Sequence, residues 1–207
     1  MIRLFNQDCM EAMKDMQDKA YELAIVDPPY GLGDRLSNGD GKLKHTPMAV
    51  LYRNSIKWDV PPTVDYFTEL FRVSCNQIIH GGNYFLDFLP KTRCFICWDK
   101  KQHLSTLSKC EFIWTSFDKP SNIFRYVSTD LMRFHPTQKP VRLYEWLLTN
   151  YAKPGDKILD THGGSMSIAI ACHIHGFDLD LYKIDKKYFE AGKKRLEEFQ
   201  KQGVLPL

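Results

Sequence analysis

Short blocks of apolar residues recur along the chain with two different periods. The run Leu23 to Val26 is continuously apolar and predicts a buried strand, whereas the apolar residues between Val64 and Cys75 recur at helical spacing. In the last third, strand and helix patterns alternate, which predicts a βαβ unit with parallel strands. The expected strands cover residues 2–5, 21–26, 77–80, 93–98, 111–117, 157–160 and 177–185, and the expected helices cover 9–16, 64–75, 141–152, 164–175 and 186–200.

Residues 31–58 lose this periodicity and contain four glycines and scattered charges, which predicts a mobile loop. A loop this long in a compact domain usually has a function. The chain has 207 residues, of which 43% are hydrophobic and 26% charged, a size and composition that suit one soluble domain with a real core. We therefore expect a single domain over residues 1–207.

Composition excludes several classes of protein. No run reaches the roughly 18 apolar residues that would cross a membrane, and the first residues lack the apolar region of a signal peptide, so a cytoplasmic protein is expected. The six cysteines are scattered rather than dense. Cys94 and Cys97 form a C-x-x-C pair, but a strand would turn them to opposite faces, so no metal site is expected.

The segment Asp27-Pro28-Pro29-Tyr30 directly follows the buried strand. Proline contributes no N–H, so the Asp27 carboxylate and the Pro28 carbonyl offer acceptors with few competing donors, which suits an exocyclic amino group. Tyr30 adds a flat face on which a planar heterocycle can stack. A strand that ends in a Pro-Pro turn with a capping aspartate explains the same four residues, so both interpretations stay open at this point.

A second site is expected where the strand at 157–160 meets the following helix. In a βαβ unit the ligand lies beyond the carboxyl end of the first strand, and here that place is the turn 160–165. Gly163 and Gly164 would let a ligand approach the backbone, although the spacing matches neither a dinucleotide-binding loop nor a P-loop, and a plain tight turn is the alternative. Asp185 ends the next expected strand and is a candidate for holding ribose hydroxyls.

Three motifs together resemble the S-adenosylmethionine-dependent DNA amino-methyltransferases: residues 27–30, 133–140 and 160–165. Their order resembles the permuted β group, in which a catalytic half, here residues 1–135, precedes a cofactor-binding half, here residues 136–207. The resemblance implies an α/β, Rossmann-like methyltransferase fold with a circularly permuted motif order. It also implies a mostly parallel twisted sheet with helices on both faces and a reversed C-terminal hairpin. S-adenosylmethionine is the implied methyl donor, and adenine N6 in DNA is the implied acceptor.

The resemblance also implies a role for each matching residue. The catalytic turn comprises Asp27, Pro28, Pro29 and Tyr30, in which the carboxylate and the Pro28 carbonyl would accept hydrogen bonds from the amino group while the tyrosine ring stacks on the extruded base. Asp8 would lie near the adenine of the cofactor. The implied cofactor-binding residues are Asp8, Asp27, His135, Thr137, Gln138, Lys139, Asp160, Thr161, His162, Gly163, Gly164, Ser165 and Asp185.

Double-stranded DNA is the implied partner, and a homodimer is allowed because some members of the group form one. Since the target amine lies inside a duplex, the base must leave the stack. Lysine and arginine outnumber acidic residues in the segments 31–58 and 119–142, which suits a phosphate backbone, although a solvated basic surface explains either segment alone. The candidates for phosphate contacts are Arg53, Lys57, Lys100, Lys101 and Arg125.

Two positions depart from the family pattern. Met166 stands where the group usually has a third small residue in the cofactor turn, and Lys183 stands where an acidic residue usually holds the ribose. An ammonium group cannot accept hydrogen bonds from hydroxyls, although Asp185, two residues on and on the same face of the expected strand, could substitute. Lys183 therefore predicts weakened cofactor binding.

Three other functions fit the same residues. Cytosine N4 methylation is the nearest, although related enzymes more often carry serine in place of Asp27. Methylation of RNA or of a protein glutamine amide is the second, for which an Asn-Pro-Pro-Tyr variant is usual. A non-catalytic DNA-binding or cofactor-sensing module is the third, and Lys183 favours it.

Overall fold

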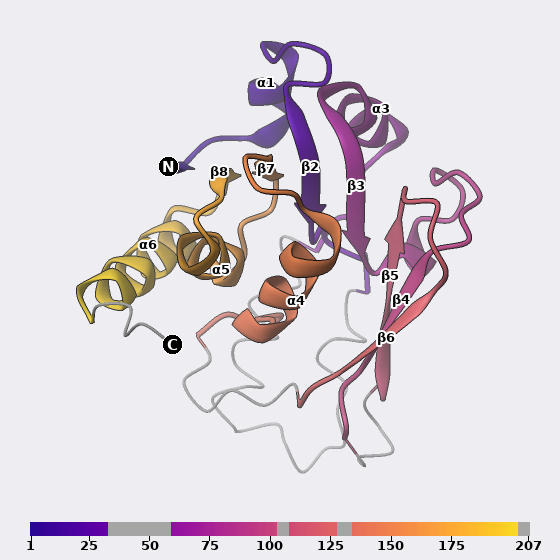
Figure 1. Ribbon diagram of the computed structural model, residues 1–207. Helices are drawn as coiled ribbons and strands as arrows, with labels where there is room; N and C mark the ends of the chain where they lie inside the picture. The colour runs from indigo at the N-terminus through magenta and orange to yellow at the C-terminus, as the bar shows by residue number, and fades with distance from the viewer. Residues whose placement is uncertain (33–58, 103–107, 128–133, 203–207) are drawn as a thin grey trace.

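A computed structural model describes residues 1–32, 59–102, 108–127 and 134–202 (Figure 1). Except for Gly31 and Leu32, the loop expected at 31–58 lies outside the described residues. Within those residues, eight strands form one sheet in the order β1-β8-β7-β2-β3-β5-β4-β6. The strands are β1 (Ile2–Phe5), β2 (Tyr21–Val26), β3 (Ser74–His80), β4 (Phe95–Asp99), β5 (Cys110–Thr115), β6 (Asn122–Arg125), β7 (Lys157–Asp160) and β8 (Asp178–Tyr182).

The sheet is parallel except at β5, which runs against both of its neighbours, β3 and β4. From β7 the chain proceeds to β8 on one side, whereas from β2 it proceeds to β3 on the other side. The direction of winding therefore reverses between β7 and β2, which pair directly. Ligands of open α/β sheets bind at such a switch point, outside the carboxyl ends of the strands. The residues that follow β2 and β7 lie at this place.

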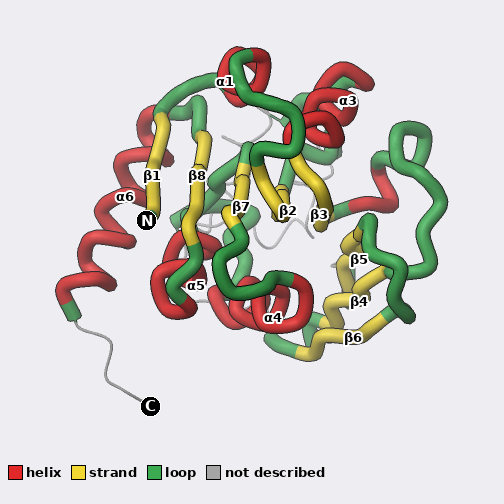
Figure 2. Tube along the Cα trace, turned by 45° about the horizontal axis from the view of Figure 1, so that its top comes forward, coloured by secondary structure: helices red, strands yellow, loops and turns green. Residues whose placement is uncertain are grey.

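Helices cover both faces of the sheet (Figure 2), as the sequence predicts. The side chains of Ala24 and Val26 pack with α1 and α3, whereas those of Leu23 and Ile25 pack with α4, α5 and α6. Because strand side chains alternate between faces, a continuously apolar β2 supplies both halves of the core. The helices are α1 (Cys9–Lys14), α3 (Val64–Val73), α4 (Val141–Tyr151), α5 (Ser167–His175), α6 (Lys186–Lys201) and the short 3₁₀ helix η3 (Gly82–Tyr84).

Two expected boundaries in the last third are wrong. Helix α5 begins at Ser167 rather than at residue 164, because Gly164 and Met166 have left-handed backbone conformations with φ of +38° and +58°, which a right-handed helix cannot contain. Strand β8 ends at Tyr182 rather than at residue 185. Asp185 instead caps α6 and accepts a hydrogen bond of 2.9 Å from the backbone N–H of Tyr188.

Two features of the far side of the sheet differ from expectation. The sequence pattern does not predict β6, a four-residue strand that pairs in parallel with β4 and exposes three of its side chains. The reversed hairpin expected at the C-terminal end is wrong for this chain, because the reversed strand is β5 in the middle of the sequence.

A buried carboxylate joins four strands at the other side of the sheet. Asp180 of β8, whose side chain is 3% exposed, accepts hydrogen bonds from Nε and Nη2 of Arg3 in β1 and from the Tyr21 hydroxyl in β2. The Lys157 ammonium at the start of β7 lies 3.3 Å away. Burial alone would raise the pKa of the Asp180 carboxyl, but the hydrogen bonds from Arg3 and Tyr21 outweigh burial and lower it.

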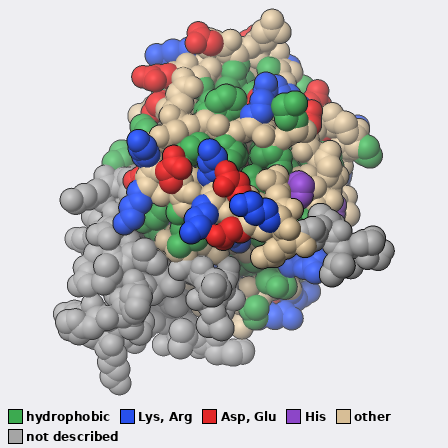
Figure 3. Space-filling view, turned by 90° about the vertical axis from the view of Figure 1, so that its left-hand side faces the viewer, with side chains coloured by type: hydrophobic (Ala, Val, Ile, Leu, Met, Phe, Trp, Pro, Cys, Tyr) green, Lys and Arg blue, Asp and Glu red, His purple; other side chains and the backbone are tan. Residues whose placement is uncertain are grey.

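The face that carries α6 mixes positive and negative side chains (Figure 3). Lys194 and Glu198, for example, lie 3.8 Å apart across one turn of α6. Alternating signs give a phosphate backbone no continuous track on this face. None of the helices described is long and apolar enough to cross a bilayer, and the described side chains include no cluster of three His, Cys, Asp or Glu that could hold a metal ion.

Candidate active site

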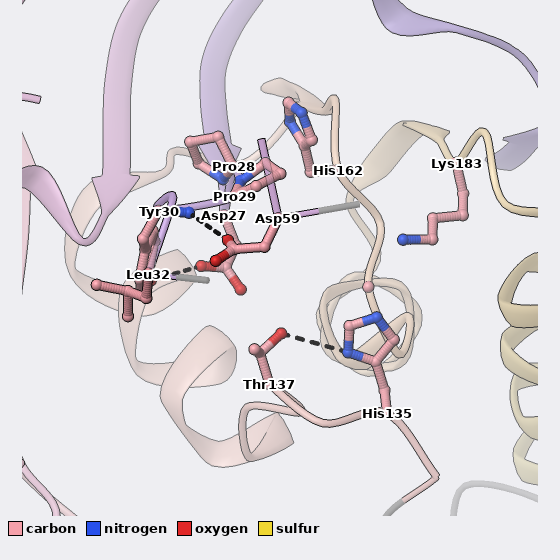
Figure 4. Close-up of a pocket in the computed structure, with 11 residues that line it drawn as sticks. Asp27, Pro28, Pro29, Tyr30, Leu32, Asp59, His135, Thr137, His162 and Lys183 are labelled. Carbon is pink, nitrogen blue, oxygen red and sulfur yellow. Dashed lines mark hydrogen bonds between the residues drawn. The ribbon is translucent and has the colours of Figure 1, made fainter. Parts of the chain in front are cut away.

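A cavity opens at the carboxyl edge of the sheet, at the switch point between β2 and β7 (Figure 4). It encloses about 470 Å³ of empty space, part of which is open to solvent. Asp27 and the two prolines after it line one side, and Gly164 of the turn after β7 lines the other. The structure therefore brings together the two sites that the sequence predicts separately. The remaining lining residues are Tyr30, Leu32, Asp59, His135, Thr137, His162 and Lys183.

A smaller cavity of about 240 Å³ continues toward the start of α5. Asp27, Thr137, His162 and Gly164 line both cavities. The smaller cavity adds further residues from the predicted cofactor set, namely Lys139, Asp160, Gly163 and Ser165. Asp27 thus lines the same two cavities as Gly164 of the glycine turn.

The carboxylate of Asp27 has two partners within the protein. Its Oδ1 accepts a hydrogen bond of 2.7 Å from the Tyr30 hydroxyl, and its Oδ2 lies 2.6 Å from the Lys139 ammonium. Asp59 fixes the same turn from outside, because its Oδ1 accepts the backbone N–H groups of Tyr30 and Gly31 at 3.1 and 3.0 Å. Asp59 follows the segment without periodicity, and no sequence pattern links it to the turn that it holds.

The ring of Tyr30 is packed on Gly81, the first residue after β3. A Cβ atom at Gly81 would lie 2.4 Å from the ring, and its φ of +64° also favours glycine. The Tyr30 ring also stacks on the Tyr84 ring, with a centroid distance of 4.9 Å and an interplanar angle of 18°. Tyr84 therefore covers part of the tyrosine that is expected to stack on a base, and its own side chain is 47% exposed beside it.

Lys139 lies at the centre of a buried group of charges. Its ammonium is 2.6 Å from Asp27 and 3.2 Å from Glu111 of β5, and its side chain is 4% exposed. Lys100 and His80 approach the same glutamate at 3.2 and 3.4 Å. Burial would raise the pKa of Glu111 and lower that of Lys139, but the opposite charges win, so the pKa of Glu111 falls and that of Lys139 rises.

Glu111 is a member of this site that sequence reasoning misses. It begins a strand and looks like an ordinary exposed strand terminus in the sequence, whereas its side chain is only 11% exposed in the structure. The partner that would reveal it, Lys139, is 28 positions away along the chain. Only the antiparallel insertion of β5 next to β3 brings the two side chains together.

The glycine turn is shaped by contacts that a side chain would prevent. A Cβ atom at Gly163 would lie 2.2 Å from Leu181 of β8, and the Gly163 N–H donates to the Tyr182 carbonyl at 2.9 Å. Met166 occupies a left-handed position where the resemblance leads one to expect a small residue, and its buried side chain packs against Gly192 of α6. The turn keeps its shape with methionine there.

The titratable groups beside the turn have shifted pKa values. Burial, together with the charge of Asp27, raises the pKa of Asp160 to about 7 despite a hydrogen bond from the His162 N–H. Burial lowers the pKa of His162 to about 4 and that of His135 to about 3, so both rings are neutral near pH 7. Lys183 points into the cavity (Figure 4), and burial lowers its pKa as well.

Four residues of the predicted cofactor set line neither cavity. Asp8 caps α1 by accepting the N–H groups of Met10 and Glu11, and Asp185 caps α6, so it does not share a strand face with Lys183 as expected. The other two residues, Gln138 and Thr161, are buried. Binding roles for these four residues stay predictions.

The predicted phosphate contacts differ in accessibility. Lys100 is 19% exposed and paired with Glu111, so it belongs to the buried charge group rather than to an open surface. Lys101 is exposed, and Arg125 is exposed with its Nε 3.7 Å from Asp99. Arg53 and Lys57 lie outside the described residues. Of the described candidates, Lys101 and Arg125 suit a phosphate contact, and Lys100 does not.

Comparison with known proteins gives matches over most of the chain. A protein-family model described as DNA methylase matches residues 97–194. The Type II methyltransferase M.HpaI of Haemophilus parainfluenzae is 24% identical over 235 residues, which cover 94% of this chain and 74% of that protein. The crystal structure of the M1.HpyAVI–SAM complex aligns with a TM-score of 0.61 at 22% identity and covers 94% of this chain and 100% of that chain. The cytosine-N4-specific PvuII DNA methyltransferase aligns with a TM-score of 0.66 at 12% identity, with 97% and 90% covered.

The structural matches confirm the expected fold, because the α/β sheet aligns with the methyltransferases over nearly their whole length. The family model covers the strands and helices that build the glycine turn, from β4 to the middle of α6. The residues 27–30 lie outside that model, and they line the same cavity as the turn. These matches support the assignment of this chain to the N6/N4 amino-methyltransferase family.

Proposed function

We propose that this chain transfers a methyl group from S-adenosylmethionine to the N6 amino group of adenine in double-stranded DNA, after the base has left the helix. One observation carries the proposal: Asp27, at the end of β2, and the glycine turn after β7 line the same cavity. A DNA methyltransferase that uses S-adenosylmethionine is the activity that the match to the DNA methylase model supports. The choice of adenine rests on Asp27.

The residues around the turn suit the cofactor. Gly163 allows the turn to pack on Leu181 with no side chain between them, which leaves the cavity beyond it open. Asp160, at the end of β7, places a carboxyl group with a pKa of about 7 next to this space, and a cation beside it would favour its charged form. Lys183 is the residue lining the larger cavity that does not suit the cofactor, because it stands where an acidic residue is expected. When bound, S-adenosylmethionine would supply a methyl group on a positively charged sulfur, and the neutral thioether that remains leaves without acid catalysis.

Asp27 and Pro28 would make the amino group of the base reactive. The N6 lone pair of adenine is delocalised into the ring, so the nitrogen is a weak nucleophile until its two hydrogens are held by acceptors. An aspartate carboxylate is too weak a base to deprotonate a neutral aromatic amine first. Asp27 therefore orients the amine and stabilises the positive charge that develops on it, and the proton leaves during or after transfer. Alignment of the two reacting atoms can contribute roughly 7 to 11 kcal/mol.

Mapping of modified bases tests the proposal. The chain is expressed in a bacterial host free of DNA methylation, and its DNA is examined by single-molecule sequencing. The expected result is methylated adenine at one short recognition sequence. DNA without any added methyl groups in cells that contain the folded protein would contradict the proposed function and favour the non-catalytic alternative.

Cytosine N4 methylation is the second candidate, and one observation favours it: the cytosine-N4-specific PvuII enzyme aligns with 97% of this chain. Both reactions methylate an exocyclic amine, so the same cavity serves either. Mass analysis of the nucleosides from the same host DNA separates the two, because N6-methyladenine and N4-methylcytosine differ in mass. N4-methylcytosine without N6-methyladenine would contradict adenine methylation and support cytosine N4 methylation.

Replacement of Lys183 by glutamate is expected to tighten S-adenosylmethionine binding. Lys183 lines the cavity at the end of β8, where the resemblance leads one to expect an acidic residue that accepts the ribose hydroxyls. A carboxylate accepts hydrogen bonds that an ammonium group cannot, and each is worth about 1.5 to 3 kcal/mol when charged. Calorimetric titration of the cofactor into both proteins measures the change, with Lys186→Glu on the exposed side of α6 as the control. An unchanged or weaker affinity in K183E would show that Lys183 is no obstacle.

A further inference from the structure

Both oxygens of the Asp27 carboxylate are already engaged inside the protein. The Tyr30 hydroxyl donates to Oδ1 at 2.7 Å, and the Lys139 ammonium lies 2.6 Å from Oδ2. An incoming amino group brings N–H donors of its own. Each oxygen of Asp27 can accept a second hydrogen bond, but its negative charge is shared with the two donors already there. A second acceptor for those donors would leave more of the carboxylate charge to the amine.

Glu111 is that second acceptor. Its Oε1 lies 3.1 Å from the Tyr30 hydroxyl and 3.2 Å from the Lys139 ammonium. Lys100 holds the other oxygen, Oε2, at 3.2 Å, and His80 Nδ1 lies 3.4 Å from Oε1. The glutamate is thus fixed from the side away from the cavity and presents Oε1 to the same two donors that occupy Asp27.

We propose that Glu111 is a positioning residue for methyl transfer. When the amine binds, Glu111 accepts a hydrogen bond from the Tyr30 hydroxyl and attracts the Lys139 ammonium, so that Asp27 can accept the amine. The inference rests on the proposed function and deepens it. The exchange requires rotation of one hydroxyl hydrogen, because the Asp27 and Glu111 oxygens both lie within hydrogen-bond distance of Tyr30. No backbone movement is needed.

Glu111 also sets the charge that the amine meets. Asp27 and Glu111 face the two ammonium groups of Lys139 and Lys100, so the four side chains carry no net charge. Without Glu111 the other three would carry one net positive charge. Since positive charge develops on the amine nitrogen during transfer, the group that contains Glu111 opposes that charge less than the group without it.

The first test compares Glu111→Ala and Glu111→Gln with the wild type, using radiolabelled S-adenosylmethionine and a duplex that contains the mapped site. In E111A, kcat is expected to fall on the order of 10²-fold, the loss typical of a misplaced reacting group. In E111Q the loss is expected to be smaller, because the amide oxygen still accepts from Tyr30. Cofactor affinity by calorimetry is expected to stay at the wild-type value in both.

A second substitution separates positioning from support of the fold. In E111A, Asp27 is the acceptor that remains for the Tyr30 hydroxyl among the described residues, so the additional change Tyr30→Phe removes the competing donor while it keeps the ring. The double variant is expected to recover kcat by roughly tenfold relative to E111A, the net worth of one hydrogen bond. If Glu111 only supports the fold, the losses of kcat caused by Glu111→Ala and by Tyr30→Phe should add in the double variant. Lack of recovery, or a wild-type kcat in E111A, overturns the proposal.

A matched control and a second readout complete the experiment. Glu145 of α4 is similarly buried, with its side chain 15% exposed, and contacts Arg142 and His175 rather than either cavity, so Glu145→Gln is expected to keep the wild-type kcat. The ¹³C signal of the Tyr30 Cζ atom in the DNA-free protein is expected to shift in E111A and not in E145Q. If the wild type methylates no DNA, the proposed function fails. If it is active and E111A changes neither kcat nor this signal, only the role of Glu111 fails.

Discussion

Replacement of Asp27 by asparagine is expected to lower kcat for methyl transfer by at least about 10²-fold, with a much smaller change in cofactor affinity. Asp27 is a charged acceptor that lines both cavities, beside the glycine turn. An amide keeps the shape of the side chain but loses the negative charge that stabilises the developing positive charge. Methyl incorporation from labelled cofactor measures kcat, and calorimetry measures cofactor affinity.

The control for this prediction is Asp99→Asn. Asp99 ends β4 and pairs with Arg125 at 3.7 Å outside both cavities, so the same chemical change there is expected to leave kcat at the wild-type value. Unfolding is not expected to obscure the result, because Lys139 keeps Glu111 as a partner at 3.2 Å when the charge of Asp27 is lost. A D27N protein that retains more than a tenth of the wild-type kcat would exclude Asp27 as the acceptor of the amine.

Replacement of Asp180 by alanine is expected to reduce the free energy of unfolding by about 3 kcal/mol. The change removes the carboxylate to which the hydroxyl of Tyr21, 3% exposed, donates, and it removes the charge that compensates Arg3 and Lys157. The side chains of Arg3 and Lys157 are 48% and 35% exposed, so they can regain water, which keeps the loss at the lower end for a buried ion pair. Urea unfolding of both proteins measures the difference.

Asp178 provides a matched control two residues earlier on the same strand. Its side chain is 61% exposed and pairs with the terminal amino group of Met1, so Asp178→Ala is expected to cost less than about 1 kcal/mol. The loss in D180A is also expected to depend on pH. Because the pKa of the folded Asp180 lies below its unfolded value near 3.8, the carboxylate stabilises the protein above that pH and ceases to do so as pH falls through the folded pKa. Wild type and D180A should therefore converge in stability in acid, and equal differences at pH 7 and pH 3 would contradict this account.

The features that the sequence predicts correctly depend on residues close together in the chain. The continuously apolar stretch before Asp27, and the strand, turn and helix around Gly163, both follow from local periodicity and turn chemistry. Their meeting at one edge follows from the general rule for parallel sheets. Lys183 is placed in the cavity as the resemblance implies.

The features that the sequence does not predict depend on contacts between distant segments. Glu111 meets Lys139, and Asp59 meets the N–H groups of Tyr30 and Gly31, only because the strands are ordered as they are. Strand β6 is short and mostly exposed, so its residues show no alternation. Asp185 is expected to replace the missing acidic residue at position 183 only if the strand continues past Tyr182. The strand ends at Tyr182, and the Asp185 carboxylate caps α6.

The order of strands has a consequence for protein synthesis. Strands β7 and β8 lie between β2 and β1 in the sheet, yet they are synthesised after the six other strands that the structure describes. A nascent chain that ends before residue 157 therefore lacks the strands that pair with β1 and with one edge of β2, and the backbone N–H and C=O groups of those edges stay unpaired by the sheet. The completed sheet, and with it the cavity, can form only after residues 157–182 have been synthesised.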